Sequence, residues 1–224
     1  MVIQLDLLRK VYYFTDLSDE ELESIKKYIS EQRVEEGEEF LSEGKRAHFM
    51  YFVVSGVVKI YKSSAEGKKQ VLNMATNGES INDVSTFNGN VTAASASAMT
   101  PVTLYKIRKT DMKIIVQEHP QVALNALKAL AGKVRRDALL VRDLSFSSIT
   151  GRLAKTLLKY FAGAKTETWP RLTQHDMATI VGTTREVVNR SLRDMEEKGA
   201  IRLERHSVVV INKNILEKMM ESSS

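Results

Sequence analysis

Five polar side chains near the end of the chain are spaced so that they could read a DNA base sequence. Arg185, Glu186, Asn189, Arg190 and Arg193 recur at intervals of one, three and four residues, which places them on one face of a helix. An arginine fork can donate two hydrogen bonds to guanine, a glutamate can accept one from cytosine, and an asparagine can pair with adenine or a phosphate. We therefore predict base contacts from Arg185, Glu186, Asn189 and Arg190.

The residues around this face predict a helix-turn-helix followed by a hairpin. Thr173 and Asp176 have the capping-box spacing that begins a first helix. Gly182 permits the tight turn, and Thr183 is expected to cap a second helix. Residues 201–211 then alternate like the two strands of a wing. The inward side chains of the second helix are expected to be Val187, Val188, Leu192 and Met195.

Two other interpretations of this face stay open. The charged side chains could form a solvated surface with pairs such as Glu186–Arg190 or Asn189–Arg193. The helix could also belong to a ligand-binding or signalling subunit that contacts protein rather than DNA. A protein-docking face should carry aromatic and apolar anchors, which this face lacks, so DNA binding is the preferred hypothesis.

Composition narrows the classes of protein. The chain of 224 residues has no cysteine, which excludes disulfides, thiolate zinc sites and iron–sulfur clusters held by cysteine. Its sequence carries no phosphate-binding loop and no histidine–carboxylate metal spacing, so we expect neither enzyme activity nor a metal site. It carries no membrane-spanning apolar run and no secretory signal, so we expect a cytoplasmic protein without a membrane partner.

Charge is uneven along the chain. Up to Ser145 there are 20 basic and 19 acidic residues, whereas from Phe146 onward there are 13 and 9. The last third is therefore the basic part of the protein. Basic surface is the electrostatic signature of a nucleic-acid partner.

The first half of the chain has the pattern of short β-strands. A helix is expected at Ser18–Tyr28, because Ser18 and Glu21 have capping-box spacing. From Gln32 to Lys109 the apolar residues alternate with period two and glycines punctuate the segments, which predicts a sandwich or jelly roll of antiparallel strands. The expected fold class is α+β, with a jelly-roll domain and its N-terminal helix over residues 1–118; the family resemblance described below makes this the effector domain.

A long helix is expected to follow the strands. The apolar spacing predicts it over Pro120–Leu144, and serines at Leu144–Ser148 predict a hinge. We therefore expect a dimerisation helix and hinge over 119–145 and a helical DNA-binding domain over 146–224. Within that domain, residues 162–170 are expected to form a loop.

One face of the long helix predicts a parallel dimer. Apolar side chains alternate at spacings of three and four, as in a coiled-coil seam, and Asp137 takes the one polar seam position. A helix of about 25 residues extends about 37 Å, which is long for packing inside one small protein. The alternative is that the helix lies on its own sandwich. The seam comprises Leu127, Leu130, Val134, Val141 and Leu144.

Three stretches resemble the cyclic-AMP receptor protein and fumarate–nitrate regulator (CRP/FNR) family of bacterial transcription factors. They are SGVVKIYKSSAEGKKQVL among the strands, ITGRLAKTLL after the hinge and IVGTTREVVNRSLRDMEEKGAI in the reading helices. The resemblance implies a cyclic-nucleotide-binding-like jelly roll, a winged helix-turn-helix, and an effector held between jelly roll and long helix. It also implies a homodimer, a palindromic operator in double-stranded DNA, and RNA polymerase as a partner. The implied base contacts are Arg185, Glu186 and Arg190, and the implied phosphate contacts are Thr173, His175 and Thr184.

The effector pocket departs from the cyclic-nucleotide pattern. Nucleotide-binding members carry a Gly-Glu pair and an arginine-containing pair, where this chain has Asn82-Asp83 and Thr92-Ala93. Asp137-Ala138 replaces the long-helix hydroxyl pair that meets adenine. A buried cyclic phosphate needs a fixed counter-charge, and Asp83 without an arginine would repel it, so cyclic AMP is not the expected ligand. The candidate pocket residues are Asn82, Asp83, Thr92 and Asp137.

The identity of the effector is left open. Haem would need an axial ligand, and only His48 and His119 lie outside the DNA-binding domain; each is better explained as a surface or turn histidine. An unidentified small effector and no effector at all remain equal alternatives. A mainly hydrophobic cavity would suit a neutral or apolar ligand, or a cation. The side chains expected to line it are Ile81, Val84, Phe87 and Val91.

Overall fold

The computed structural model describes residues 3–89, 91–161, 172–204 and 207–221. The chain forms two compact units, Met1–Lys62 with Asn73–Arg135, and Ser63–Leu72 with Arg136–Ser224. The boundary between them falls inside the long helix, and the three-part functional division by residue number stays a prediction. The loop predicted at 162–170 and the tip of the predicted wing lie outside the described residues.

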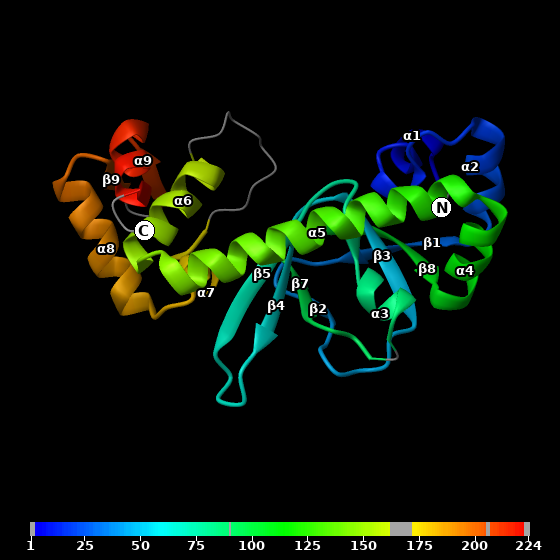
Figure 1. The fold of residues 1–224 in the computed structure, drawn as a ribbon, viewed down its shortest axis with the longest axis horizontal. Helices are drawn as coiled ribbons and strands as arrows, with labels where there is room; N and C mark the ends of the chain where they lie inside the picture. Colours follow the sequence, from blue (N-terminus) through cyan, green and yellow to red (C-terminus); the bar gives the residue numbers. More distant parts are fainter. Residues whose placement is uncertain (1–2, 90, 162–171, 205–206, 222–224) are drawn as a thin grey trace. The chain divides into compact units, whose positions relative to one another are not determined.

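The first unit is built around two four-stranded sheets with the strand orders β1-β8-β3-β6 and β2-β7-β4-β5 (Figure 1). Strand β8 pairs antiparallel with both β1 and β3, and β7 pairs antiparallel with both β2 and β4. One buried hydrophobic cluster takes residues from both sheets, so they enclose a common core. This confirms the predicted sandwich. The strands are β1 (Ile29–Val34), β2 (Glu39–Leu41), β3 (Phe49–Ser55), β4 (Val58–Ser63), β5 (Lys69–Ala75), β6 (Ser80–Ile81), β7 (Ser95–Ala98) and β8 (Val102–Arg108).

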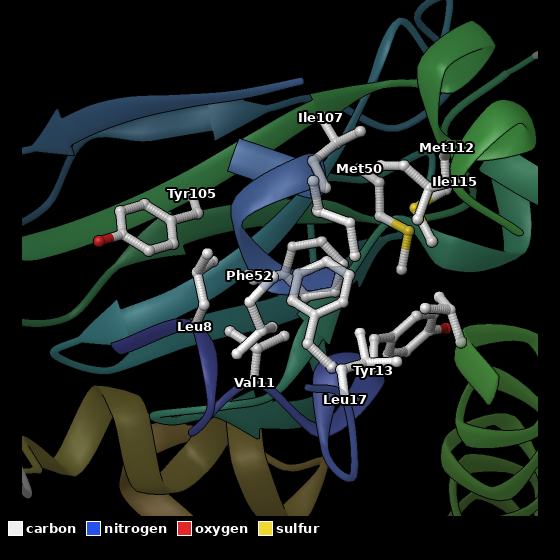
Figure 2. Close-up of a cluster of buried hydrophobic side chains, with 14 of the residues drawn as sticks. Leu8, Val11, Tyr13, Leu17, Met50, Phe52, Tyr105, Ile107, Met112 and Ile115 are labelled. Carbon is white, nitrogen blue, oxygen red and sulfur yellow. The ribbon is translucent and has the colours of Figure 1, made fainter. Parts of the chain in front are cut away.

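A second core lies on the opposite face of β3 and β8, beneath helices (Figure 2). Alternation along β3 explains why one strand serves both cores: Met50 and Phe52 enter the helical cluster, whereas Tyr51 and Val53 enter the sandwich. The ring centroids of Phe52 and Tyr13 lie 5.3 Å apart. The start of the long helix contributes Val122 and Ala126 to this core. The other covering helices are α1 (Leu5–Leu8), η1 (Tyr12–Phe14), α2 (Asp19–Lys26) and α4 (Lys109–Glu118).

Local signals correctly predicted two helix starts in this unit. Helix α2 begins after Ser18, whose hydroxyl accepts from the Glu21 N–H while the Glu21 carboxylate accepts from the Ser18 N–H. The long helix α5 (Pro120–Phe146) begins at its proline. Its first turns are buried, and the Asn125 amide donates to backbone carbonyls of the η1 region, at 3.2 Å to Tyr13 and 2.7 Å to Thr15.

The second unit is a small helical domain with a hairpin. Helix α5 runs on to Phe146, so the interruption is confined to Ser147 and Ser148, a shorter hinge than predicted. The hairpin strands pair antiparallel, as the wing pattern predicted. The wing was expected to extend to Ile211, and the helix that follows it was not predicted. The elements are α6 (Ile149–Phe161), α7 (Gln174–Val181), α8 (Arg185–Glu197), β9 (Ile201–Glu204), β10 (Ser207–Val210) and α9 (Lys213–Glu221).

Candidate nucleic-acid interface and effector site

A tight turn fixes α7 against α8. Thr173 and Asp176 form the predicted capping box at the start of α7. Gly182 adopts the left-handed conformation with φ 73°, and the next N–H, from Thr183, bonds the Ala178 carbonyl at 3.0 Å. The predicted cap of the second helix was wrong by one residue. Thr184, not Thr183, is the N-cap, and its hydroxyl accepts from the Val187 N–H at 3.4 Å.

Helix α8 has one buried and one polar exposed face. Val188, Leu192 and Met195 are fully buried, whereas Val187, expected to face inward, is only half-buried. Arg185, Glu186, Arg190 and Arg193 are exposed, and Asn189 is half-buried. The exposed face carries a shallow hollow of about 440 Å³. Its lining residues are Glu186, Asn189, Arg190, Arg193, Asp194 and Glu197.

The side chains predicted to read bases are not held in ion pairs or hydrogen bonds with one another along the helix. Among the described residues, Glu186 and Arg190 form no ion pair with each other, and Asn189 forms no hydrogen bond with Arg193. Arg185 makes one long contact, from Nε to the Gln174 amide oxygen at 3.4 Å. Hydrogen bonds from its own backbone and from Thr184 hold the pKa of Glu186 below its usual range, so this carboxylate is ionised at neutral pH.

The side chains predicted to approach phosphates lie at helix starts. Thr173, His175 and Thr184 are all exposed, at or next to the N-termini of α7 and α8. Unpaired backbone N–H groups and the positive end of the helix dipole favour anions at such positions. The Thr173 hydroxyl already bonds Asp176 at 2.7 Å, so its first role is to hold the helix start.

The predicted effector segment contains a buried charge, and the protein supplies its partner. Asp83, in the short helix α3 (Asp83–Phe87), is 3% exposed. Its Oδ2 atom accepts from Lys133 Nζ at 2.6 Å, from the Ser80 hydroxyl at 2.9 Å and from the Tyr13 hydroxyl at 3.2 Å. Lys133 also donates to the backbone and hydroxyl oxygens of Ser80, at 2.7 and 3.1 Å, so all its ammonium protons have acceptors.

Tyr13 is a neutral donor in this cluster. Burial, followed by the nearby Asp83 charge, raises the pKa of its phenol far above the usual value. Sequence reasoning missed Lys133 as a member of the site. The only available signal was a lysine on the long helix of a protein whose pocket segment carries an unmatched aspartate.

The other predicted pocket residues have separate environments. Asn82 has φ 69° and donates from its amide to the Phe49 carbonyl at 2.8 Å. Thr92 is 2% exposed, and its hydroxyl is the one buried side-chain polar atom among the described residues that lacks a hydrogen-bond partner. Asp137 is exposed on α5.

The expected hydrophobic lining of the pocket was wrong. Ile81 is buried at 2% exposure, but Val84, Phe87 and Val91 are 51%, 42% and 55% exposed. Part of the reason is α3, which was not predicted: within this turn Asp83, Ser85 and Thr86 are buried, whereas Val84 and Phe87 are exposed. Val91 lies outside α3, in an isolated bridge with Arg46. The buried polar members are Ser80, Asp83, Ser85, Thr86 and Thr92.

Each half of the chain matches a known protein family. Residues 31–119 match the cyclic nucleotide-binding domain family, and residues 151–219 match the Crp-like helix-turn-helix domain family. The chain belongs to the CRP/FNR family of transcription regulators.

Relatives of this CRP/FNR protein match it over nearly full length. The CRP-like cAMP-activated global transcriptional regulator of Mycobacterium tuberculosis is 26% identical over 92% of this chain and 94% of its own. The cyclic AMP receptor protein of Thermus thermophilus is 27% identical over 92% and 95%. Among solved structures, the c-di-GMP-responsive global regulator CLP of Xanthomonas campestris has TM-score 0.79 at 19% identity, covering 87% of this chain and all of that one, which shows the same fold.

The long helix of this CRP/FNR protein presents apolar side chains to solvent. Leu127, Val134 and Val141 are 63%, 68% and 63% exposed, Leu144 is 38% exposed and Leu130 is half-buried. Five of the six predicted seam positions, counting Asp137, are thus exposed in the single chain. Two of them, Leu127 and Val134, lie in the first unit and are not covered by its sandwich. An exposed apolar stripe of this length marks an interaction surface.

Three other points about the CRP/FNR chain concern metal sites, membrane-spanning helices and haem ligands. In the part of the chain that the structure describes, no three His, Asp or Glu side chains gather where they could hold a metal ion. Those same residues include no helix that is both long and apolar enough to span a membrane. Of the two haem candidates, His119 hydrogen-bonds the Ser24 hydroxyl at 2.9 Å, and His48 is exposed.

Proposed function

We propose that this CRP/FNR protein is a homodimer that binds a palindromic operator and reads it with Arg185, Glu186, Asn189 and Arg190. The observation that supports this most strongly is the outward face of α8, where the exposed Arg185 and Arg190 form no close ion pair and no side-chain hydrogen bond with another described residue of the helix. Such forks are available for bidentate bonds to guanine O6 and N7. Thr173, His175 and Thr184 would then fix the two helix starts against backbone phosphates.

Dimerisation through α5 is supported by the exposed seam. A second copy would cover the stripe at Leu127, Val134 and Val141, whose exposure costs free energy in water. A two-fold axis along these helices would present two α8 helices, which is why we expect a palindromic site. By family resemblance the complex would act on RNA polymerase in the cytoplasm.

For this protein we propose an effector other than cyclic AMP, or none. The relatives named above are described as cAMP-activated or cyclic AMP receptors. In this chain Lys133 already neutralises the buried carboxylate of Asp83. Where nucleotide-binding members carry an arginine that could bind the phosphate, this chain has Thr92. An added cyclic phosphate would enter beside Asp83 without its own counter-charge.

Selection from random duplex DNA tests the DNA-binding proposal directly. Full-length protein is incubated with a pool of random duplexes, and bound DNA is recovered and sequenced over several rounds. We expect enrichment of a two-fold symmetric sequence with a guanine in each half-site. Recovery of unrelated sequences, or of one asymmetric half-site bound by a monomer, would contradict the proposal.

A further inference from the structure

A basic hollow is lined only by residues of the first unit. It has a volume of about 530 Å³, within the range of small-ligand sites. The pairing of β3 with β8 creates it, because Phe49 lies directly opposite Arg108 in the register. This brings the loop before β3 beside the first turns of α4. The groups that can carry positive charge around the hollow are Arg46, His48, Arg108, Lys109 and Lys113.

These cations lack local anions. No aspartate or glutamate lines the hollow. Among the described residues, Arg46, Arg108 and Lys113 form no ion pair and no side-chain hydrogen bond. Lys109 donates to the Gly89 carbonyl and keeps further N–H donors free. The hollow is therefore lined by several positive groups that no ion pair in the described part of the chain neutralises.

Their position also opposes the local electrostatics of the fold. Arg108 is the N-cap residue of α4, and Lys109 and Lys113 lie in its first turns, with Asp111 as the one acidic residue of the first turn. Cations at a helix N-terminus meet the positive end of the helix dipole and lower helix stability. Residues that conflict with local stability in this way are expected at functional sites.

We infer that this hollow binds a small anion carrying two or more phosphate groups. Several converging cations exceed what one monoanion can neutralise, and arginine forks suit bidentate phosphate binding. The site is concave and has Phe49 and Ala47 in its wall, which favours a compact ligand over an extended surface partner. Nothing in this inference depends on DNA binding by α8.

Calorimetric titration of the full-length protein with inorganic pyrophosphate tests the site, at roughly 50 mM and then roughly 500 mM salt. We expect one site per chain whose affinity falls at high salt. Arg108→Gln with Lys113→Gln should weaken binding at least about tenfold, as expected for losing charge-assisted hydrogen bonds. Because Arg108 opposes the helix dipole at the N-cap and neither residue forms an ion pair with a described residue, the double variant should not melt below the wild type, which separates loss of binding from loss of folding.

Two control variants locate the binding. Lys10→Gln with Lys128→Gln removes the same charge from exposed residues elsewhere on the unit and should leave pyrophosphate affinity unchanged. Arg185→Gln with Arg190→Gln should abolish DNA selection yet keep pyrophosphate binding. If pyrophosphate binding is lost in either control, or is absent in the wild type, the inference is overturned whether or not the chain binds DNA.

Two further ligands identify the source of the phosphates. If adenosine triphosphate binds with the same affinity as pyrophosphate, the ligand is a simple polyphosphate. If adenosine triphosphate binds more tightly than pyrophosphate, the site is assigned to a nucleotide. A peptide of acidic residues that binds as tightly as pyrophosphate would point to a protein partner and overturn the small-ligand assignment.

Discussion

Lys133 on α5 and Asp83 on α3 form a nearly buried ion pair, with Nζ 2.6 Å from Oδ2 and side chains 20% and 4% exposed. Ser80 and Tyr13 donate to the same carboxylate oxygen, so the pair is embedded in a closed hydrogen-bond network. It joins the long helix to the segment where the family resemblance places an effector. The protein thus supplies the counter-charge for this carboxylate from its own chain.

Breaking this pair should destabilise the first unit. Lys133→Met leaves Asp83 as an uncompensated buried charge, and we expect a loss of about 3 kcal/mol in the free energy of unfolding. Asp83→Asn combined with Lys133→Met should cost less than the two single changes added together, because the partners share one interaction. Denaturant unfolding of the four proteins measures this, with Lys128→Met on exposed α5 surface as a matched control. Strictly additive losses would show that the two residues do not act as a pair.

Cyclic AMP should leave the protein unchanged. A ligand at 100 times its dissociation constant stabilises the folded state by about 2.7 kcal/mol, which a thermal shift detects easily. At millimolar concentration we expect no rise in melting temperature and no change in operator affinity. The M. tuberculosis relative, whose name describes cAMP activation, is the positive control. An upward shift in this chain, with cyclic AMP or cyclic GMP, would disprove our account of the pocket.

Arg185 and Arg190 should discriminate between bases. Replacing either by alanine removes a bidentate guanine contact, so we expect a loss of about 1–3 kcal/mol on the operator and little change on scrambled DNA. Fluorescence anisotropy at fixed salt measures both affinities. Equal weakening on the two DNAs would mean that these arginines contact only phosphates.

Asp137 should limit dimer affinity. It is exposed at a seam position of α5, where two carboxylates would meet across a dimer axis and repel each other. Asp137→Leu should therefore tighten the dimer, which sedimentation equilibrium measures. Lys128→Leu adds the same side chain off the seam and should have no such effect. An unchanged dimer constant in Asp137→Leu would remove Asp137 from the seam.

Asp143 should make the second unit more stable at neutral pH than at acid pH. Burial alone would raise the pKa of Asp143, but hydrogen bonds and charge from Lys155 and Arg142 outweigh burial and lower it. A lowered folded pKa stabilises the protein above the unfolded value of about 4, and the effect is lost as pH falls through the folded pKa. Asp143→Asn should cost about 1 kcal/mol or less at pH 7, because its partners are largely exposed. Thermal unfolding of both proteins should differ at pH 7 and converge below about pH 4; a constant difference would refute the pairing.

Features set by neighbouring residues could be predicted from the sequence. Each capping box, at Ser18 and at Thr173, joins two residues three positions apart. The left-handed turn at Gly182 depends on the glycine itself. The strand alternation and the polar face of α8 follow from helical and extended periodicity. For these reasons the sandwich and the helix-turn-helix were predicted correctly. Arg185, Glu186 and Arg190 are exposed on α8 as expected, and their role in reading bases stays a prediction.

Some local features were still ambiguous. Thr183 and Thr184 have the same capping chemistry, so only the observed geometry showed that Thr184 caps α8. The single turn of α3 was too short to give a periodic signal. Within this turn Val84 and Phe87 are exposed, contrary to the expected lining.

The tertiary structure alone decided the contacts between distant residues. Lys133 and Asp83 are 50 residues apart, and nothing in either neighbourhood specifies the other. The basic hollow likewise depends on the register that places Phe49 opposite Arg108. Sequence periodicity determines which face of an element is buried. Which charged side chains meet depends on how the elements pack, and packing is a property of the whole folded unit rather than of any one segment.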